Sequence, residues 1–260
     1  MTLMMQLFAS LGLLAALAGT PAAALTYYSE QNLPFNGVDE QGRSSGFSIE
    51  LLRLMWQELG QEEAPIQFLP WSKAWYLLTQ QPDAVLLTTA HTLPRSHHLQ
   101  WVCPISRSRI VLMARADHLP RIRHRADLLT LKIGAMQADV GEQLLLNRGM
   151  PPAQLMTVPR MDLVVRQLLL ARTDLVAGNE TMLRYQIRQL GYDPRQFVTV
   201  AVLAEQDNCF AFNPAVDPAE VALLQQALDR VRQGPAFQAL QARYEDMLNP
   251  STHERLPEIE

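Results

Sequence analysis

The chain has 260 residues and a formal net charge of −4, so its charge does not indicate a nucleic-acid-binding protein. Hydrophobic residues make up 48% of it, enough for one large or two modest domains with their own cores. Beyond the N-terminal segment, no apolar run reaches the roughly 20 residues of a membrane-spanning helix. The length, composition and charge favour a globular protein and give no indication of a nucleic-acid partner.

The first 24 residues have the layout of a secretory signal peptide. They contain no charged side chain, hold an apolar stretch and end in the small residues Ala22 to Ala24, a pattern typical of cleavage after Ala24. A membrane anchor is the alternative, but the apolar stretch is shorter than a spanning helix and Pro21 interrupts it. We therefore expect an exported protein.

After this segment, β-like runs alternate with amphipathic helical runs. The expected elements of the first hundred residues are a strand at 25–30, a helix at 46–60, a strand at 66–70, a helix at 71–81 and a strand at 84–88. The order βαβαβ is typical of a parallel sheet covered by helices. The sequence therefore predicts an α/β fold.

The same alternation then starts again. Strands are expected at 109–115, 132–136, 155–159, 175–179, 197–205 and 209–213, and helices at 139–149, 161–172 and 180–191. Two further helices, at 218–234 and 235–248, have no strand of their own and should pack back on the first unit. Residues 249–260 form a polar, proline-bearing tail. The pattern predicts two α/β lobes.

Candidate ligand contacts lie where the predicted strands end. Open α/β sheets bind ligands beyond the carboxyl ends of their strands, and a cleft between two lobes suits a small molecule. The side chains at these ends are Ser29, Glu30, Trp71, Thr88, Thr89, Arg95, Gln137, Asp139 and Asn179.

The chain contains two cysteines, Cys103 and Cys209. In an oxidising compartment they can form one intramolecular disulfide. Two buried free thiols that pack as small apolar side chains are the alternative. The residues alone leave both possibilities open.

Six segments in order carry a resemblance to a known family. They are residues 33–60, with a Pro-Phe loop and a Gly-Phe-x-x-Glu-Leu helix, then 69–87, then TLPR (92–95) followed by LQWVCP, then 131–145, 172–187 and 209–244. With these segments the chain resembles the family 3 extracellular solute-binding proteins, the polar amino acid receptors of ATP-driven importers. The resemblance covers nearly all of the chain after the signal peptide.

The resemblance implies a type II periplasmic-binding-protein-like fold. Two lobes, each a mainly parallel sheet flanked by helices, are joined by a hinge of two strands that cross near 103–108 and 205–210. Lobe 1 would comprise 25–104 and 209–248, lobe 2 would comprise 105–208, and 249–260 would be the tail. Cys103 and Cys209 would then lie on neighbouring hinge strands, which favours a disulfide.

The resemblance also implies ligand contacts. Arg95 matches the arginine that holds the ligand carboxylate with two parallel N–H groups, and Trp71 matches an aromatic that packs on the ligand. Asn179 stands where amino acid receptors have an aspartate for the ligand ammonium, and Ala90 stands where a threonine is usual. Ser29 stands near the position where the family has another acidic ligand contact, and Glu30 is next to it. The expected ligands are therefore amino acids, modified amino acids or small carboxylates.

Two other kinds of site have weaker support in the sequence. His91, His97 and His98 could be read as metal ligands, but neighbouring histidines on a strand point to opposite faces, so we expect polar surface histidines and no metal or cofactor. Glu30, Asp139 and Glu180 could serve as a general acid or base, since the same fold hosts small dehydratases. No hydrolase or phosphate-loop motif accompanies them, so we expect binding rather than catalysis.

The resulting expectation is a periplasmic, monomeric binding protein. It would capture a small carboxylate-bearing molecule between its lobes and deliver it to an ABC permease in the inner membrane. A periplasmic sensor that reports the same ligand to a separate protein is the remaining alternative.

Overall fold

The structure is a computed structural model that describes residues 24–248, except for the side chain of Arg125. The predicted signal peptide, up to residue 23, and the predicted tail at 249–260 lie outside the described residues. Within residues 24–248, no helix combines the length and the apolar character needed to cross a membrane.

Eight strands form one sheet in the order β4-β1-β5-β10-β6-β9-β7-β8. Their bounds are β1 Thr26–Ser29, β4 Ile66–Phe68, β5 Ala84–Ala90, β6 Gln100–Arg115, β7 Ile133–Met136, β8 Leu155–Val158, β9 Leu175–Asn179 and β10 Phe197–Phe212. A separate hairpin pairs β2, Gly37–Val38, with β3, Ser44–Ser45. At one end β1 runs parallel to β4 and β5, and at the other β7 runs parallel to β8 and β9. The predicted α/β fold with mainly parallel sheets is confirmed.

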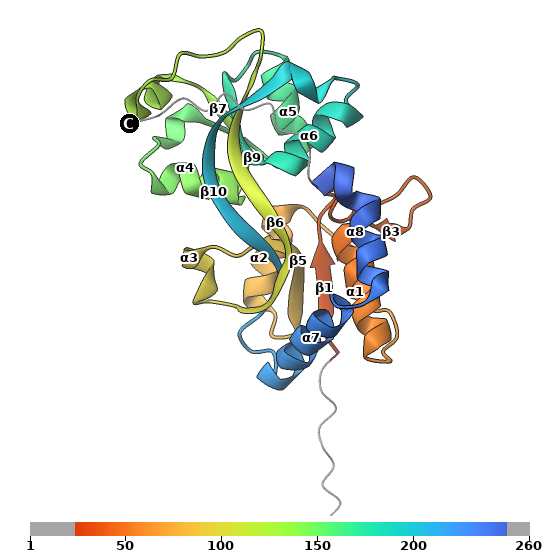
Figure 1. Cartoon of the computed structure of the whole chain (residues 1–260). Coiled ribbons are helices and arrows are strands. Elements are labelled where there is room, and N and C mark those ends of the chain that lie inside the picture. The colour runs from red at the N-terminus through yellow and green to blue at the C-terminus, as the bar shows by residue number, and fades with distance from the viewer. Residues whose placement is uncertain (1–23, 249–260) are drawn as a thin grey trace, which may run out of the picture.

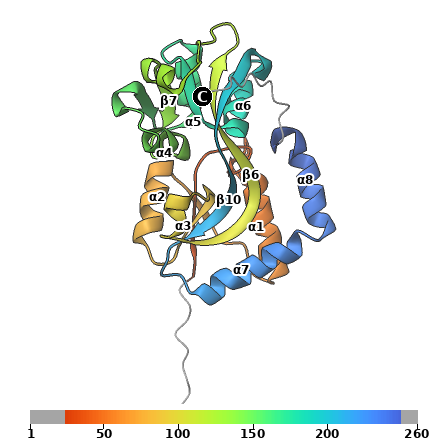
Figure 2. The same cartoon turned by 60° about the vertical axis from the view of Figure 1, so that its left-hand side comes forward.

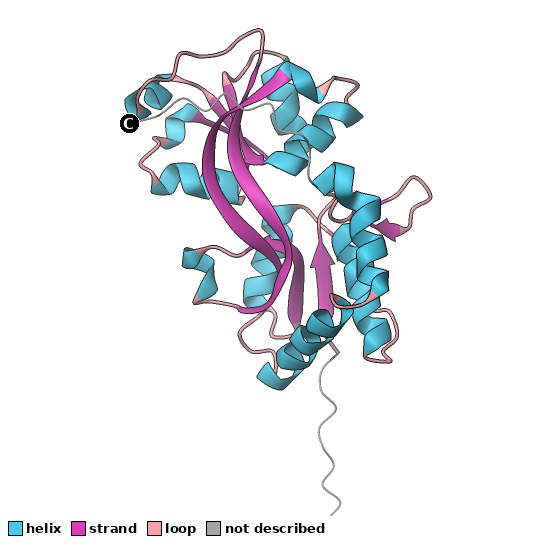
Figure 3. Ribbon diagram, in the orientation of Figure 1, coloured by secondary structure: helices cyan, strands magenta, loops and turns pink. Residues whose placement is uncertain are grey.

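Helices cover both ends of this sheet (Figure 3). Their bounds are α1 Phe47–Glu58, α2 Trp71–Gln80, α3 Leu93–Ser96, α4 Val140–Asn147, α5 Met161–Leu169, α6 Glu180–Gln189, α7 Pro218–Val231 and α8 Pro235–Leu248, with short 3-10 turns at η1 Arg125–Thr130, η2 Pro152–Gln154 and η3 Pro194–Gln196. We call the part built from β1, β4, β5, α1, α2, α3, α7 and α8 lobe 1, and the part built from β7, β8, β9, α4, α5 and α6 lobe 2. Figure 1 shows lobe 1 below and lobe 2 above.

Two long antiparallel strands, β6 and β10, join the lobes (Figure 1). In lobe 1, β10 pairs with β5 from Asn208 to Phe212, and in lobe 2, β6 pairs with β9 from Ile110 to Met113. In between, residues 107–109 and 205–207 have only each other as described strand partners. A two-stranded ribbon without lateral support is the part of a sheet that bends most easily, so this stretch is suited to act as a hinge.

The sequence predicted β10 as two runs, 197–205 and 209–213, but the structure joins them into one strand. Residues 205–208 are polar and interrupt the apolar pattern where the ribbon passes between the lobes; Glu205 is exposed there, whereas Asn208 is buried. Both crossing strands run from one lobe to the other without a break, so no strand end marks where a lobe stops. The lobe boundaries at 104/105 and 208/209 therefore stay a prediction.

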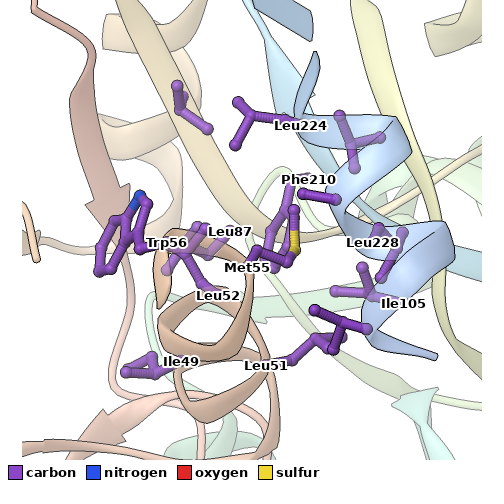
Figure 4. Close-up of a cluster of buried hydrophobic side chains, with 14 of the residues drawn as sticks. Ile49, Leu51, Leu52, Met55, Trp56, Leu87, Ile105, Phe210, Leu224 and Leu228 are labelled. Carbon is purple, nitrogen blue, oxygen red and sulfur yellow. The ribbon is translucent and has the colours of Figure 1, made fainter. Parts of the chain in front are cut away.

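The core of lobe 1 is formed around α1 (Figure 4). Ile49, Leu52, Met55 and Trp56 are buried, at the helical spacing expected from the sequence, and they pack with Phe210 of β10. Complete burial of each such side chain contributes about 1.5–3 kcal/mol. Helices α7 and α8 contact α1, so the C-terminal helices pack on the elements that we group as lobe 1 (Figure 2).

A disulfide joins the two crossing strands beside the hinge. Cys103 of β6 and Cys209 of β10 are bonded, and their Cα atoms lie 4.8 Å apart. This separation falls in the ordinary range for a disulfide. The bond lies at the lobe 1 end of the ribbon, beside the paired residues Asn208 and Ser106.

Candidate functional site

A small cavity lies between the two lobes. Lobe 1 and the segments that follow its strands contribute Glu30, Asn32, Phe35, Trp71, Thr88 and Ala90; the ribbon contributes Ile110 and Asn208; and lobe 2 contributes Asp139, Val140, Asn179 and Met182. Only about 20 Å³ is open to the centre of a water molecule. This is close to the minimum for one water, so an amino-acid-sized ligand can enter only when the lobes separate.

Three hydrogen bonds cross the cleft, and a fourth joins the lobes elsewhere, from Thr181 Oγ1 of α6 to the Leu248 backbone oxygen of α8 at 3.3 Å. Trp71 Nε1 donates to the backbone oxygen of Ala138 at 2.9 Å, and Arg95 Nη2 donates to Gln143 Oε1 at 3.0 Å. Asn32 Nδ2 lies 3.1 Å from Met182 Sδ. Donor and acceptor belong to different lobes in each pair. The structure is therefore a closed form.

A larger cavity opens outward from the same place. Its volume is about 600 Å³, and it shares Glu30, Asn32 and Trp71 with the small cavity. Arg160, Asp162 and Tyr185 line its lobe 2 side. Its volume is in the range of small-molecule sites, whereas the small cavity behind it has room for little more than a water molecule in this closed form.

Arg95 is buried beside the small cavity and has 4% of its surface exposed. Its guanidinium lies over the rings of Trp75, at 4.6 Å, and Trp71, at 5.5 Å. Burial lowers the pKa of Arg95 to about 10, and the charge of Asp139 opposes that change. Its Nε has no hydrogen-bond partner among the described residues. A buried cation with an unused donor is a favourable site for an anion.

Two carboxyl groups face each other in the cavity, Glu30 from lobe 1 and Asp139 from lobe 2. Burial and the charge of Asp139 raise the pKa of Glu30 to about 8, while a hydrogen bond from Asn32, at 3.2 Å, acts in the opposite direction. Burial also raises the pKa of Asp139, although Arg95 favours its ionised form. The pair therefore holds a proton more readily than two solvated carboxyls.

The structure brings five of the nine candidate side chains to the small cavity: Glu30, Trp71, Thr88, Asp139 and Asn179. Arg95 does not line this cavity, but it contacts Trp71 and the backbone oxygen of Ala90, which belong to residues that do. The other three point elsewhere: Ser29 is fully buried in β1, the Thr89 hydroxyl donates to the Leu86 backbone oxygen, and Gln137 is exposed. The strand is irregular at this point, since Thr88 has a φ of 49° and the pairing of β5 with β10 shifts register, so the direction of the two threonines does not follow simple alternation.

Several residues that the sequence analysis did not single out contribute to the site, among them Phe35, Ile110, Val140, Met182 and Asn208, which line the small cavity. Asn32 lines the cavity, and Trp75 and Gln143 hold the Arg95 guanidinium. Trp75 follows Trp71 by four positions, so the shared helix face was a usable signal. Asn32 follows Glu30 by two positions in the loop after β1. Gln143 offered no signal, because its role depends on how the lobes meet.

Glu180 and His91 make contacts outside the small cavity. The Glu180 carboxylate is engaged by Arg184, Thr199 and Arg109 and does not line the small cavity. The ring of His91 packs edge-on against Trp101, with 4.7 Å between ring centroids. Among residues 24–248, no group of three or more His, Cys, Asp or Glu side chains is arranged to hold a metal ion.

The Trp71 hydrogen bond provides a test of how the closed form is stabilised. Trp71→Phe removes the bond to Ala138, so we expect it to lower the free energy of unfolding by about 1 kcal/mol more than Trp101→Phe does. Trp101 is the matched control because its buried Nε1 has no partner in the described chain. Urea unfolding measures both. Equal losses would show that ring packing, rather than the cross-lobe bond, accounts for the effect.

Two α/β lobes joined by two long strands, with a polar cavity lined from both sides, are the architecture of a two-lobed binding protein. The sequence profile of the bacterial extracellular solute-binding proteins, family 3, matches residues 25–247. The chain belongs to this family. No curated protein matches it by sequence.

Solved structures share the fold at low sequence identity. A histidine kinase sensor domain similar to periplasmic binding proteins has a TM-score of 0.75 and 20% identity, over 85% of this chain and 96% of that chain. The arginine-, lysine-, histidine-binding protein ArtJ from Geobacillus stearothermophilus has a TM-score of 0.71 and 14% identity, over 85% and 95%. An ancestral amino acid-binding protein, a precursor of cyclohexadienyl dehydratase, has 0.69 and 17%, over 87% and 95%. The family and its structural neighbours are mainly binding proteins.

Proposed function

We propose that the protein is exported to the periplasm and captures a small carboxylate-bearing ligand, an amino acid or a relative of one, for an ABC importer. The observation that carries this proposal is Arg95. It is a buried arginine beside a cavity lined from both lobes, and its Nε lacks a partner among the described residues. A ligand carboxylate would satisfy that donor and neutralise the desolvated charge.

The mechanism that we propose is a shift in population between open and closed forms. A ligand that contacts both lobes binds the closed form better and therefore increases its share. Trp71 would pack on the apolar part of the ligand while Asp139 and Asn179 contact it from lobe 2. The closed protein, acting as a monomer, would be the form that the permease recognises.

A thermal-shift screen tests the proposal, because a ligand that binds only the folded state raises the melting temperature by mass action. We expect at least one compound among L-arginine, L-glutamine and glutarate to raise it by several degrees. Succinamide, which lacks a carboxylate, is the control and should have no effect. If it stabilises the protein as well as the carboxylates do, recognition does not depend on the carboxylate.

Catalysis is a second candidate, because Glu30 and Asp139 are carboxyl groups of raised pKa that lie inside the cavity. Incubation of the purified protein with each stabilising compound, followed by NMR, separates the two functions. Recovery of unchanged compound supports binding. Turnover that disappears in Glu30→Gln or Asp139→Asn would identify an enzyme instead.

A further inference from the structure

Closure of the cleft brings together two carboxyl groups that belong to different lobes. Glu30 follows β1 of lobe 1, Asp139 precedes α4 of lobe 2, and both line the small cavity. Asp139 is 8% exposed and Glu30 is partly buried. The cavity has room for about one water molecule. Little solvent therefore screens the two groups from each other, and each disfavours the ionised form of the other.

From this arrangement we propose that closure of the lobes takes up one proton, which Glu30 and Asp139 share, so that acid shifts the ligand-free protein towards its closed form. Base shifts it towards an open form, in which both carboxyl groups are solvated and ionised. Because a ligand can enter only when the lobes separate, acid would also slow its capture. The proton uptake is a property of the protein without ligand, so it stands apart from the proposed function.

The charges around the pair balance when it holds one proton. Arg95 supplies one positive charge and remains cationic near neutral pH, since burial lowers its pKa only to about 10. Burial raises the pKa of Asp139, the charge of Arg95 acts in the opposite direction, and Glu142 adds to the rise. If Glu30 and Asp139 were both ionised, one negative charge in the closed site would lack a counterion, which is costly. One proton removes that charge.

The hydrogen-bonding groups of the cavity also favour a protonated carboxyl. Asn32 Nδ2 lies 3.2 Å from Glu30 Oε1 and 3.1 Å from Met182 Sδ of lobe 2. The Oδ1 of the same amide is buried and has no partner among the described residues. An ionised Glu30 only accepts hydrogen bonds, whereas a protonated Glu30 has an O–H to donate. Asn32 Oδ1 and the Asp139 carboxylate are the acceptors that line the cavity with it.

The pKa of Glu30 sets the range of pH over which closure should respond. Burial and the charge of Asp139 raise it to about 8 in the closed form, while the hydrogen bond from Asn32 acts in the opposite direction. Separation of the lobes removes Asp139 and the cover of lobe 2, so the pKa returns towards its ordinary value of 4.5. The closed form thus binds the proton more strongly. The ratio of closed to open protein should fall as the pH rises from about 5 to about 8.

The other titratable groups that border Glu30 do not explain such a response. Glu30 also lines the larger cavity, where Arg160, Asp162 and Tyr185 come from lobe 2. Arg160 lowers the pKa of Asp162, so this carboxyl stays ionised, and burial raises the pKa of Tyr185, so the phenol stays neutral. None of the histidines within residues 24–248 lines either cavity.

Single-molecule FRET on protein freed of ligand by unfolding and refolding tests the inference. Dyes on Gln80→Cys of α2 and Asn147→Cys of α4 report the separation of the lobes, because both positions are exposed and the two helices belong to different lobes (Figure 2). The native Cys103 and Cys209 are bonded to each other and do not take up dye. We expect the ratio of closed to open molecules to be at least about tenfold higher at about pH 5.5 than at about pH 7.5.

Three variants assign the response to the carboxyl pair. Glu30→Gln keeps the shape of the protonated side chain and removes its titration, so the closed fraction should be the same at both pH values. Asp139→Asn should reduce the pH dependence several-fold, because Glu30 then faces no second carboxylate. Glu245→Gln, which removes an exposed carboxylate from α8, is the control and should keep the full dependence.

An equal ratio at both pH values in the unaltered protein would overturn the inference, and so would a pH dependence that persists in Glu30→Gln. Neither result bears on the proposed function, which predicts stabilisation by a carboxylate-bearing compound. A ligand screen in which no compound stabilises the protein would remove the proposed function and leave the response of the ligand-free protein to be judged by the FRET measurement alone.

Discussion

Glu180→Gln is expected to lower the free energy of unfolding by about 3–5 kcal/mol, the usual cost of removing one partner from a buried ion pair. The Glu180 carboxylate is 2.9 Å from Arg184 Nη2 and 3.2 Å from Arg109 Nη1, and it accepts the Thr199 hydroxyl at 2.7 Å. Glu180 is 3% exposed and Arg184 is 1% exposed. The neutral amide would leave the Arg184 charge buried without a counterion, and urea unfolding measures the loss.

Glu205→Gln is the matched control. Glu205 pairs with the same Arg109, at 3.5 Å, but 70% of its side chain is exposed. The same change of charge there should cost less than about 1 kcal/mol. Similar losses in the two variants would mean that the burial of Glu180 does not determine its contribution. Because Glu180 does not line the small cavity, the variant should still bind the ligand once it is folded.

Arg95→Ala is expected to weaken binding of a carboxylate ligand such as L-arginine by about 2–5 kcal/mol, the range for truncating one partner of a buried, hydrogen-bonded charge pair. The guanidinium is held between Trp71, Trp75 and Gln143, so it is oriented before the ligand arrives. Arg95→Lys should recover only part of the affinity, because an ammonium cannot pair with both carboxylate oxygens through a planar fork. Isothermal titration measures both variants.

Gln143→Leu separates two roles of Arg95. The variant removes the cross-lobe partner at 3.0 Å and leaves the guanidinium over the tryptophan rings. We expect less than a tenfold change in affinity. If Gln143→Leu weakened binding as much as Arg95→Ala, closure of the lobes rather than contact with the carboxylate would be the role of Arg95.

The fold was largely predictable because its elements follow local patterns. The apolar spacing of α1 placed Ile49, Met55 and Trp56 in the core, and the repeated strand-helix order predicted two α/β lobes. The continuity of β10 was not predictable, because residues 205–208 are polar in a strand that crosses between lobes. Sequence periodicity shows a strand where apolar residues alternate with polar ones, and this polar part of β10 has no such alternation although the strand continues.

The site was predictable only in part. The carboxyl ends of the strands pointed to Glu30, Thr88, Asp139 and Asn179, and all four line the small cavity. The contacts that hold Arg95 arise where two lobes meet, and no local pattern encodes them. The Asn179 side chain caps the N-terminus of α6, and this role likewise depends on where the helix begins.

The disulfide changes the connectivity of the chain. The chain passes from lobe 1 to lobe 2 through β6 and returns to lobe 1 through β10. The disulfide between Cys103 and Cys209 links these two strands at their lobe 1 end. The chain from 103 to 209 is therefore a covalent ring attached to lobe 1. One proteolytic cut anywhere inside the ring opens it but releases no fragment, so a nicked protein keeps its full mass until the disulfide is reduced.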